Sequence, residues 1–159
     1  MGMGATVSDL HLFSHHSRPG RYMNVIRETS ARADVFVLNG DIFDFKWSEH
    51  GVFTSSVRAA EHFLEVMMEA APECPFHFVL GNHDAVPPYM ESLRRMERLH
   101  PNLHWHEFTC VIEDRIFLHG DVIHAGSTHR AVRRFRSRLR QPAVGHRLQR
   151  WAHTAVHGS

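Results

Sequence analysis

The segment Val35-Phe36-Val37-Leu38-Asn39-Gly40-Asp41-Ile42-Phe43-Asp44 shows the pattern that organises the whole chain. An apolar run leads directly into a polar turn that contains glycine, which is typical of a buried strand followed by a loop. Side chains that can bind metal ions, such as those of Asp41 and Asp44, then follow just beyond the carboxyl end of the strand. The same arrangement recurs at residues 5–7 before Asp9-Leu10-His11, at 76–80 before Gly81-Asn82-His83-Asp84, and at 116–118 before His119-Gly120-Asp121.

Helical periodicity occupies the stretches between these strands. Residues 54–71 carry one apolar stripe, and weaker helical patterns cover 21–33 and 87–99. Alternation of strands and helices predicts an α/β fold with a mainly parallel sheet core flanked by helices. Residues 103–107 and 108–112 alternate better in polarity, and we interpret them as antiparallel strands.

The turns that follow the strands predict a metal site. The carboxyl ends of parallel strands share one edge of a sheet, where ligands bind. Several carboxylates gathered there repel one another unless cations neutralise their charge. Carboxylates, imidazoles and an amide together suit two divalent ions as ligands. Gly40, Gly81 and Gly120 fit turns in which the backbone passes close to an ion or a substrate.

Length and composition narrow the class of protein. A chain of 159 residues and 18.4 kDa forms one domain, or one domain with a tail. Its apolar fraction of 43% excludes a mostly disordered chain, and it has no apolar run of about 18 residues. Two cysteines exclude a disulfide framework and a multi-cysteine zinc site, and together with a start that lacks signal-peptide features they predict a cytoplasmic protein. The 16 histidines favour metal chemistry.

Charge is distributed unevenly along the chain. Residues 1–121 carry a net charge of −7, whereas the last 38 residues hold eight arginines and no acid. We therefore divide the chain into a core at 1–124 and a basic helical cap or tail at 125–159. An amphipathic stripe in the tail comprises Val132, Phe135 and Leu139. Such a helix can pack on the body, lie on an anionic membrane, bind nucleic acid, or hold a diphosphate through arginine side chains.

The motifs in combination resemble the calcineurin-like metallophosphoesterases over residues 5–121, and in detail the UDP-2,3-diacylglucosamine pyrophosphatase branch. The matching elements are Asp-x-His at Asp9 and His11, Gly-Asp-x-x-Asp at Gly40-Asp41 and Asp44, Gly81-Asn82-His83-Asp84, and a strand-end His119. The resemblance implies two divalent ions, Mn²⁺ by expectation with Fe or Zn²⁺ as alternatives. It implies that Asp9 and His11 bind the first ion, that Asp41 bridges, and that Asn82 and His119 bind the second.

The resemblance also implies a reaction. Two cations acidify a bridging water and hold phosphate oxygens for in-line attack on a phosphodiester, a pyrophosphate or a phosphomonoester. His83 would stand near the phosphate as proton donor or charge stabiliser, and Asp44 would orient its imidazole. Arg130 and Arg134 are the candidates for substrate binding. The expected substrate is a phosphorylated small molecule or a lipid nucleotide such as a UDP-diacylglucosamine, with peripheral contact at the inner face of the membrane.

The family's final Gly-His-x-His motif is not found. Gly145-His146-Arg147-Leu148 begins like it but lacks the second histidine. We therefore expect a truncated chain, in which His146, or His153 and His157, are the candidates to replace the missing ligands. Two alternatives from other classes remain: a non-catalytic metal-binding remnant of the fold, and a basic nucleic-acid-binding module.

Overall fold

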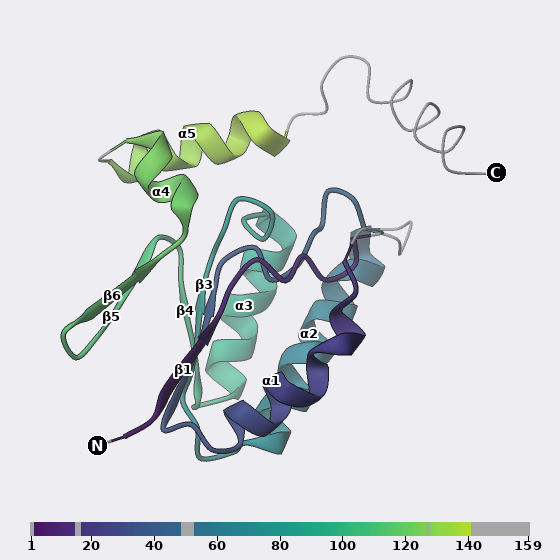
Figure 1. The fold of residues 1–159 in the computed structure, drawn as a ribbon. Helices are drawn as coiled ribbons and strands as arrows, with labels where there is room; N and C mark the ends of the chain where they lie inside the picture. Colours follow the sequence, from purple (N-terminus) through teal and green to yellow (C-terminus); the bar gives the residue numbers. More distant parts are fainter. Residues whose placement is uncertain (1, 15–16, 49–52, 127, 141–159) are drawn as a thin grey trace.

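A four-stranded parallel sheet forms the centre of the molecule (Figure 1). The computed structural model describes residues 2–14, 17–48, 53–126 and 128–140. The strands lie in the order β1-β2-β3-β4 and pair in parallel throughout. Their bounds are β1 Gly4–Val7, β2 Val35–Asn39, β3 Phe76–Val79 and β4 Leu103–His106.

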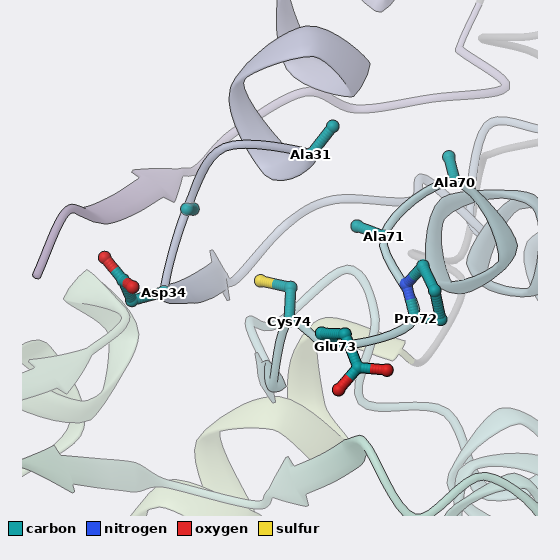
Figure 2. A pocket seen from close by; sticks show the side chains of 8 residues that line it. Ala31, Asp34, Ala70, Ala71, Pro72, Glu73 and Cys74 are labelled. Atoms are coloured by element: carbon teal, nitrogen blue, oxygen red, sulfur yellow. The ribbon is translucent and has the colours of Figure 1, made fainter.

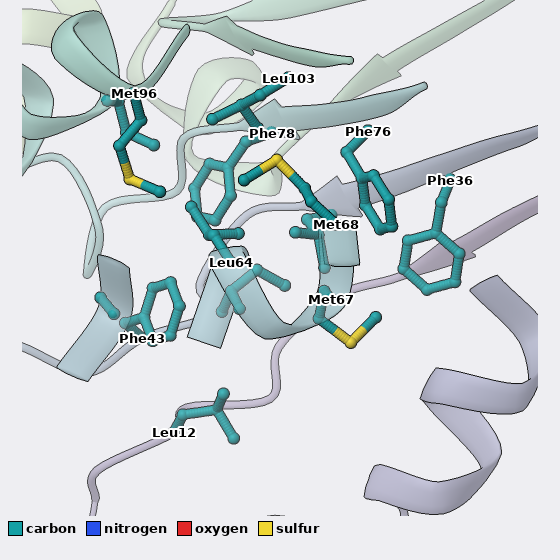
Figure 3. Close-up of a cluster of buried hydrophobic side chains, with 14 of the residues drawn as sticks. Leu12, Phe36, Phe43, Leu64, Met67, Met68, Phe76, Phe78, Met96 and Leu103 are labelled. Carbon is teal, nitrogen blue, oxygen red and sulfur yellow. The ribbon is translucent and has the colours of Figure 1, made fainter. Parts of the chain in front are cut away.

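Three helices cover one face of this sheet: α1 (Met23–Ser30), α2 (Phe53–Ala70) and α3 (Pro87–Leu99). A short 3₁₀ turn, η1 (Pro19–Arg21), precedes α1. Alternate side chains of β3 point to opposite faces, so Phe76 and Phe78 enter the main core while His77 and Val79 face the other side. Figure 3 shows this core, in which Leu64 and Met67 of α2 pack among the phenylalanines.

The predicted helices are confirmed closely, with α2 and α3 within one residue of the expected ends and α1 shorter than expected. Two strand predictions are wrong. Residues 103–106 form β4, which is parallel to β3, because α3 lies between them as a crossover connection. Residues 116–118 lie in β6 (Arg115–Leu118), which is outside the main sheet and pairs antiparallel with β5 (Thr109–Ile112).

The β5–β6 hairpin lies on the side of the sheet opposite the helices (Figure 1). The two-residue connection Glu113-Asp114 is the length that favours a hairpin, and Glu113 has the positive φ of 54° that such turns require. Cys110 packs against Val37 and Val79 in a second, smaller core. The Asn39 side-chain amide donates to the Leu118 carbonyl at 3.2 Å, so the end of β6 is tied to the carboxyl end of β2.

Two helices follow the hairpin, α4 (Gly120–Ala125) and α5 (His129–Arg140), and both lie beyond the carboxyl ends of the strands (Figure 1). In the predicted stripe of α5, Val132 is buried, Phe135 is half-buried and Leu139 is exposed. Arg136, one turn from Val132, is also buried. Among the described residues, no helix is both long enough and apolar enough to cross a bilayer.

Candidate metal centre and active site

The loops that follow β1 and β2 are held together by backbone hydrogen bonds. The amide of Asp9 donates to the Gly40 carbonyl at 3.0 Å, and the amide of His11 donates to the Asp41 carbonyl at 3.0 Å. Asp9, His11 and Asp41 all adopt positive φ, at 53°, 45° and 52°. Each non-glycine residue in that region costs about 1–3 kcal/mol, and such strain gathers at functional sites. Three of the predicted ligands are therefore strained positions, as is Phe13 in the loop after β1, with a φ of 78°.

The carboxylate of Asp41 lies at the centre of the site. Its Oδ2 is 3.5 Å from Nε2 of His119 and 4.0 Å from Nε2 of His11. Its Oδ1 accepts the backbone N–H of His83 at 2.9 Å. Asp9 completes the group, because its Oδ1 is 3.6 Å from Nε2 of His119.

These side chains form two groups of potential metal donors that share Asp41. One group is Asp9, Asp41 and His119, and the other is His11, Asp41 and His83. Within each group the donor atoms lie within 4.8 Å of one another. Carboxylate oxygen and imidazole nitrogen suit Mn²⁺, Fe and Zn²⁺, so the donor set fits two divalent ions with a common carboxylate.

Two glycines allow this close approach. A Cβ on Gly40, whose φ is +79°, would stand 2.6 Å from the His119 ring. A Cβ on Gly81 would overlap the backbone nitrogen and the carboxylate of Asp41. Gly120 begins α4, and a Cβ there would meet no atom of the described residues within 4 Å, so no protein contact requires glycine at this position.

His83, the predicted proton donor, lies beside Asp44, the residue predicted to orient its imidazole. Nδ1 of His83 is 3.2 Å from Oδ1 of Asp44, as an ion pair rather than a well-aligned hydrogen bond. The Asp44 carboxylate raises the pKa of His83, against the opposing effect of burial. Burial alone would raise the pKa of Asp44, but His83 and the backbone amide of Trp47 outweigh it and lower the pKa. The ring of His11 stands edge-on to that of His83, with centroids 4.7 Å apart.

His119 is oriented by a chain of contacts to α5 that sequence reasoning missed. Its Nδ1 is 3.0 Å from Oδ1 of Asp121, and Nε of Arg136 donates to Oδ2 of Asp121 at 2.6 Å. Burial lowers the pKa of His119, but Asp121 and the other nearby carboxylates overcome this effect and raise it. A carboxylate on the far nitrogen of a ligating histidine fixes its tautomer and direction. The available signal was the position of Arg136, four residues after Val132 on the packed face of α5.

Asp84 is a second residue whose role was missed. It is completely buried and accepts the backbone N–H groups of Ile42, Phe43 and Gly81. Burial, together with the nearby charge of Asp41, raises the pKa of Asp84 to about 7. Asp84 thus links the loop after β2 to the loop after β3.

The remaining predicted residues are placed as follows. Asn82 is half-buried in the turn after β3, between Gly81 and His83. Arg130 and Arg134 are exposed on α5 and are not part of either donor group. His146, His153 and His157 lie outside the described residues.

A hollow of about 300 Å³ lies elsewhere, at the amino-terminal edge of the sheet (Figure 2). Asp34, just before β2, and Cys74, just before β3, line it together with alanines from the ends of α1 and α2. It contains none of the donor groups described above. The metal centre is therefore a surface assembly of loops at the opposite edge and does not use this hollow.

A parallel sheet with carboxylates and imidazoles converging at its carboxyl edge is typical of metal-binding α/β proteins. The calcineurin-like phosphoesterase family matches residues 5–158, and the chain belongs to that family. The family generally uses divalent metal ions. A search of curated proteins finds no match to this chain.

Proposed function

We propose that this chain hydrolyses phosphoester or pyrophosphate bonds with two divalent cations held by Asp9, His11, Asp41, Asn82 and His119. The observation that carries the proposal is the position of Asp41, whose Oδ2 faces both His11 and His119. The two donor groups share this carboxylate, as a dinuclear centre requires; they place Asp9 with His119 and His11 with His83, and the role of His83 as proton donor instead of ligand follows the family resemblance. Asn82 is included because it stands in the turn beside His83, one residue from the buried Gly81.

When bound, the two cations would supply the positive charge that acidifies a water molecule and holds phosphate oxygens. The protein supplies the rest. Asp44 holds Nδ1 of His83, which leaves Nε2 free to deliver a proton to the leaving oxygen. In the metal-free chain the Asp44 carboxylate raises the pKa of His83, and it would oppose the lowering of that pKa by bound cations. Asp121, backed by Arg136, keeps Nε2 of His119 directed at Asp9 and Asp41.

The finer proposal is Mn²⁺ as the metal and a lipid-nucleotide pyrophosphate of the UDP-diacylglucosamine kind as substrate. Its support is the placement of α5: Arg136 anchors the helix to the site, while Arg130 and Arg134 remain exposed and available to a diphosphate. An exposed basic helix beside the site would also suit a substrate presented at an anionic membrane surface.

The test is hydrolysis of bis(p-nitrophenyl) phosphate by the full chain at increasing Mn²⁺. Replacing the shared carboxylate in Asp41→Asn should lower kcat/KM by about 10³-fold, because several kcal/mol of charge stabilisation depend on both ions. Asp114→Asn, in the exposed hairpin turn, is the matched control and should leave the rate unchanged. Absence of turnover in the wild type at every Mn²⁺ concentration would overturn the proposal in favour of a metal-binding remnant.

A further inference from the structure

A third group of donors lies on the other face of the sheet and shares no residue with the phosphoesterase site. It consists of His77 on β3, His106 on β4 and Cys110 on β5. Strand alternation turns His77 away from the main core, and the parallel register places His104 of β4 directly beside it. The ring of His77 stacks on that of His106, with centroids 5.3 Å apart.

The donor atoms have the spacing of a tetrahedral zinc site. Nδ1 of His77 is 3.0 Å from Nε2 of His106 and 3.4 Å from Sγ of Cys110. All three donor atoms lie within 4.8 Å of one another. Bond lengths of about 2.0–2.1 Å to nitrogen and 2.3 Å to sulfur place tetrahedral ligands roughly 3.3–3.6 Å apart. A small shift of the rings would therefore admit an ion.

The environment keeps these donors available. Burial, followed by the nearby His106 and His104 rings, lowers the pKa of His77 to about 4. Burial likewise lowers the pKa of His106. Both shifts favour the neutral ring, which is the form that ligates metals. Cys110 is only 2% exposed, and this burial raises the pKa of its thiol, so the thiolate forms when the metal ion displaces the proton.

We propose that His77, His106 and Cys110 bind a Zn²⁺ ion, whose coordination a water molecule would complete. Two imidazoles and a thiolate are ligands that zinc prefers, whereas the donor groups around Asp41 contain no sulfur and also suit Mn²⁺ and Fe. The two sites are thus distinguished by their chemistry as well as by their place in the fold.

An ion at this position would connect the hairpin to the sheet. His77 and His106 belong to adjacent strands of the sheet, and Cys110 belongs to the hairpin that ends at His119. Metal bound by all three would hold β5 in place and, through β6, support the position of His119. The role inferred for the ion is structural, and binding would stabilise the fold.

Cobalt substitution tests the proposal directly, because Co²⁺ bound to a thiolate gives a near-ultraviolet charge-transfer band. The band should appear when Co²⁺ is added to the metal-free full chain, and it should be lost in Cys110→Ser and in His77→Gln. Cys74→Ser is the matched control, since Cys74 is equally buried but lies at the other edge of the sheet beside Asp34. It should retain the full band.

A second measurement separates this inference from the proposed function. Zinc at about a hundredfold excess over its Kd should raise Tm by roughly 5 °C or more in Asp41→Asn, which lacks the shared carboxylate of the other centre, but not in the double variant Asp41→Asn/Cys110→Ser. If wild-type protein shows no charge-transfer band with Co²⁺, the proposal fails. A band that survives in Cys110→Ser also overturns it. Neither result bears on hydrolysis at Asp41.

Discussion

Backbone strain at single residues is the most specific feature of the sheet edge where the candidate metal ligands meet. Asp9, His11 and Asp41 all occupy the left-handed region, although none of them is glycine. The conformation persists because each backbone is held by the neighbouring loop, as in the bond from His11 to the Asp41 carbonyl. The strain is compensated by packing, and its effect is to direct three donor side chains at one point.

His83 should affect the reaction according to the leaving group. His83→Ala should lower kcat by about 10²–10⁴-fold for a substrate with a poor alkoxide leaving group, which needs a proton. For an activated aryl leaving group the loss should be much smaller. Steady-state kinetics on both substrates, with metal analysis of the same samples, measures this difference.

Metal content should stay nearly unchanged in His83→Ala, because His83 is assigned as the proton donor and not as a ligand. This measurement tests the assignment strictly, because the ring of His83 lies close enough to His11 and Asp41 to act as a metal ligand itself. Equal losses on both substrates would indicate phosphate positioning instead. Loss of metal would show that His83 is a ligand.

The pH dependence of Cys74 follows from its surroundings. Burial, together with the negative charge of Asp34, raises the thiol pKa above its ordinary 9.0. The stabilisation linked to this protonated thiol is fully present below that value and is lost as pH rises through the folded pKa. Iodoacetamide should therefore modify Cys74 slowly below about pH 9 in a Cys110→Ser background. Asp34→Asn should speed modification, and an unchanged rate would contradict the electrostatic cause.

At the scale of elements, the glycine turns decide whether the loops can converge. Gly81→Ala should destabilise the protein by about 3 kcal/mol, because its Cβ would overlap the backbone of Asp41. In this chain that corresponds to a fall in Tm on the order of 10 °C. Gly120→Ala is the matched control: it opens α4 with free space around it and should change stability by less than about 1 kcal/mol. Similar melting temperatures for the two variants would refute this reading of the turns.

Helix α5 is anchored by one buried arginine. The guanidinium of Arg136 donates to Asp121 and to the carbonyls of Glu107 and Leu80. Arg136→Met would leave the Asp121 carboxylate buried without its partner, so we expect a loss of about 3–5 kcal/mol in urea unfolding. Arg134→Met, two residues away on the same helix and exposed, should cost less than about 0.5 kcal/mol. Partial rescue by Asp121→Asn in the Arg136→Met background would confirm the cause, and equal effects of both arginines would disprove it.

Local patterns in the sequence predicted the helices and the strands up to β3, because apolar periodicity is a property of neighbouring residues. They did not predict the partners of β4 and β6, which depend on connections and distant packing. His119 reaches the site although β6 is outside the main sheet, since Asn39 holds the Leu118 carbonyl beside β2. The cluster of His77, His106 and Cys110 was likewise invisible, because it exists only through the register of β3 with β4 and the docking of the hairpin.

At the scale of the whole molecule, the charge asymmetry along the chain allows ion pairs to form between the basic helix α5 and the acidic body. The basic helix α5 returns to the acidic body, where Arg133 donates two hydrogen bonds to the Glu107 carboxylate at 2.7 and 2.6 Å. Arg136 neutralises Asp121 beside the candidate metal ligands. Part of the predicted basic surface is therefore used in docking, while Arg130 and Arg134 remain exposed to meet a substrate.

The central claim is that Asp41 joins two metal ions, and electron paramagnetic resonance of the Mn²⁺-loaded full chain tests it most directly. At two equivalents of Mn²⁺ we predict the spectrum of a spin-coupled pair, because a shared carboxylate holds the ions close together. In Asp41→Asn the coupled signal should be lost, and in the control Asp114→Asn it should remain. A wild-type spectrum that shows only isolated Mn²⁺ ions at saturation would contradict the dinuclear centre.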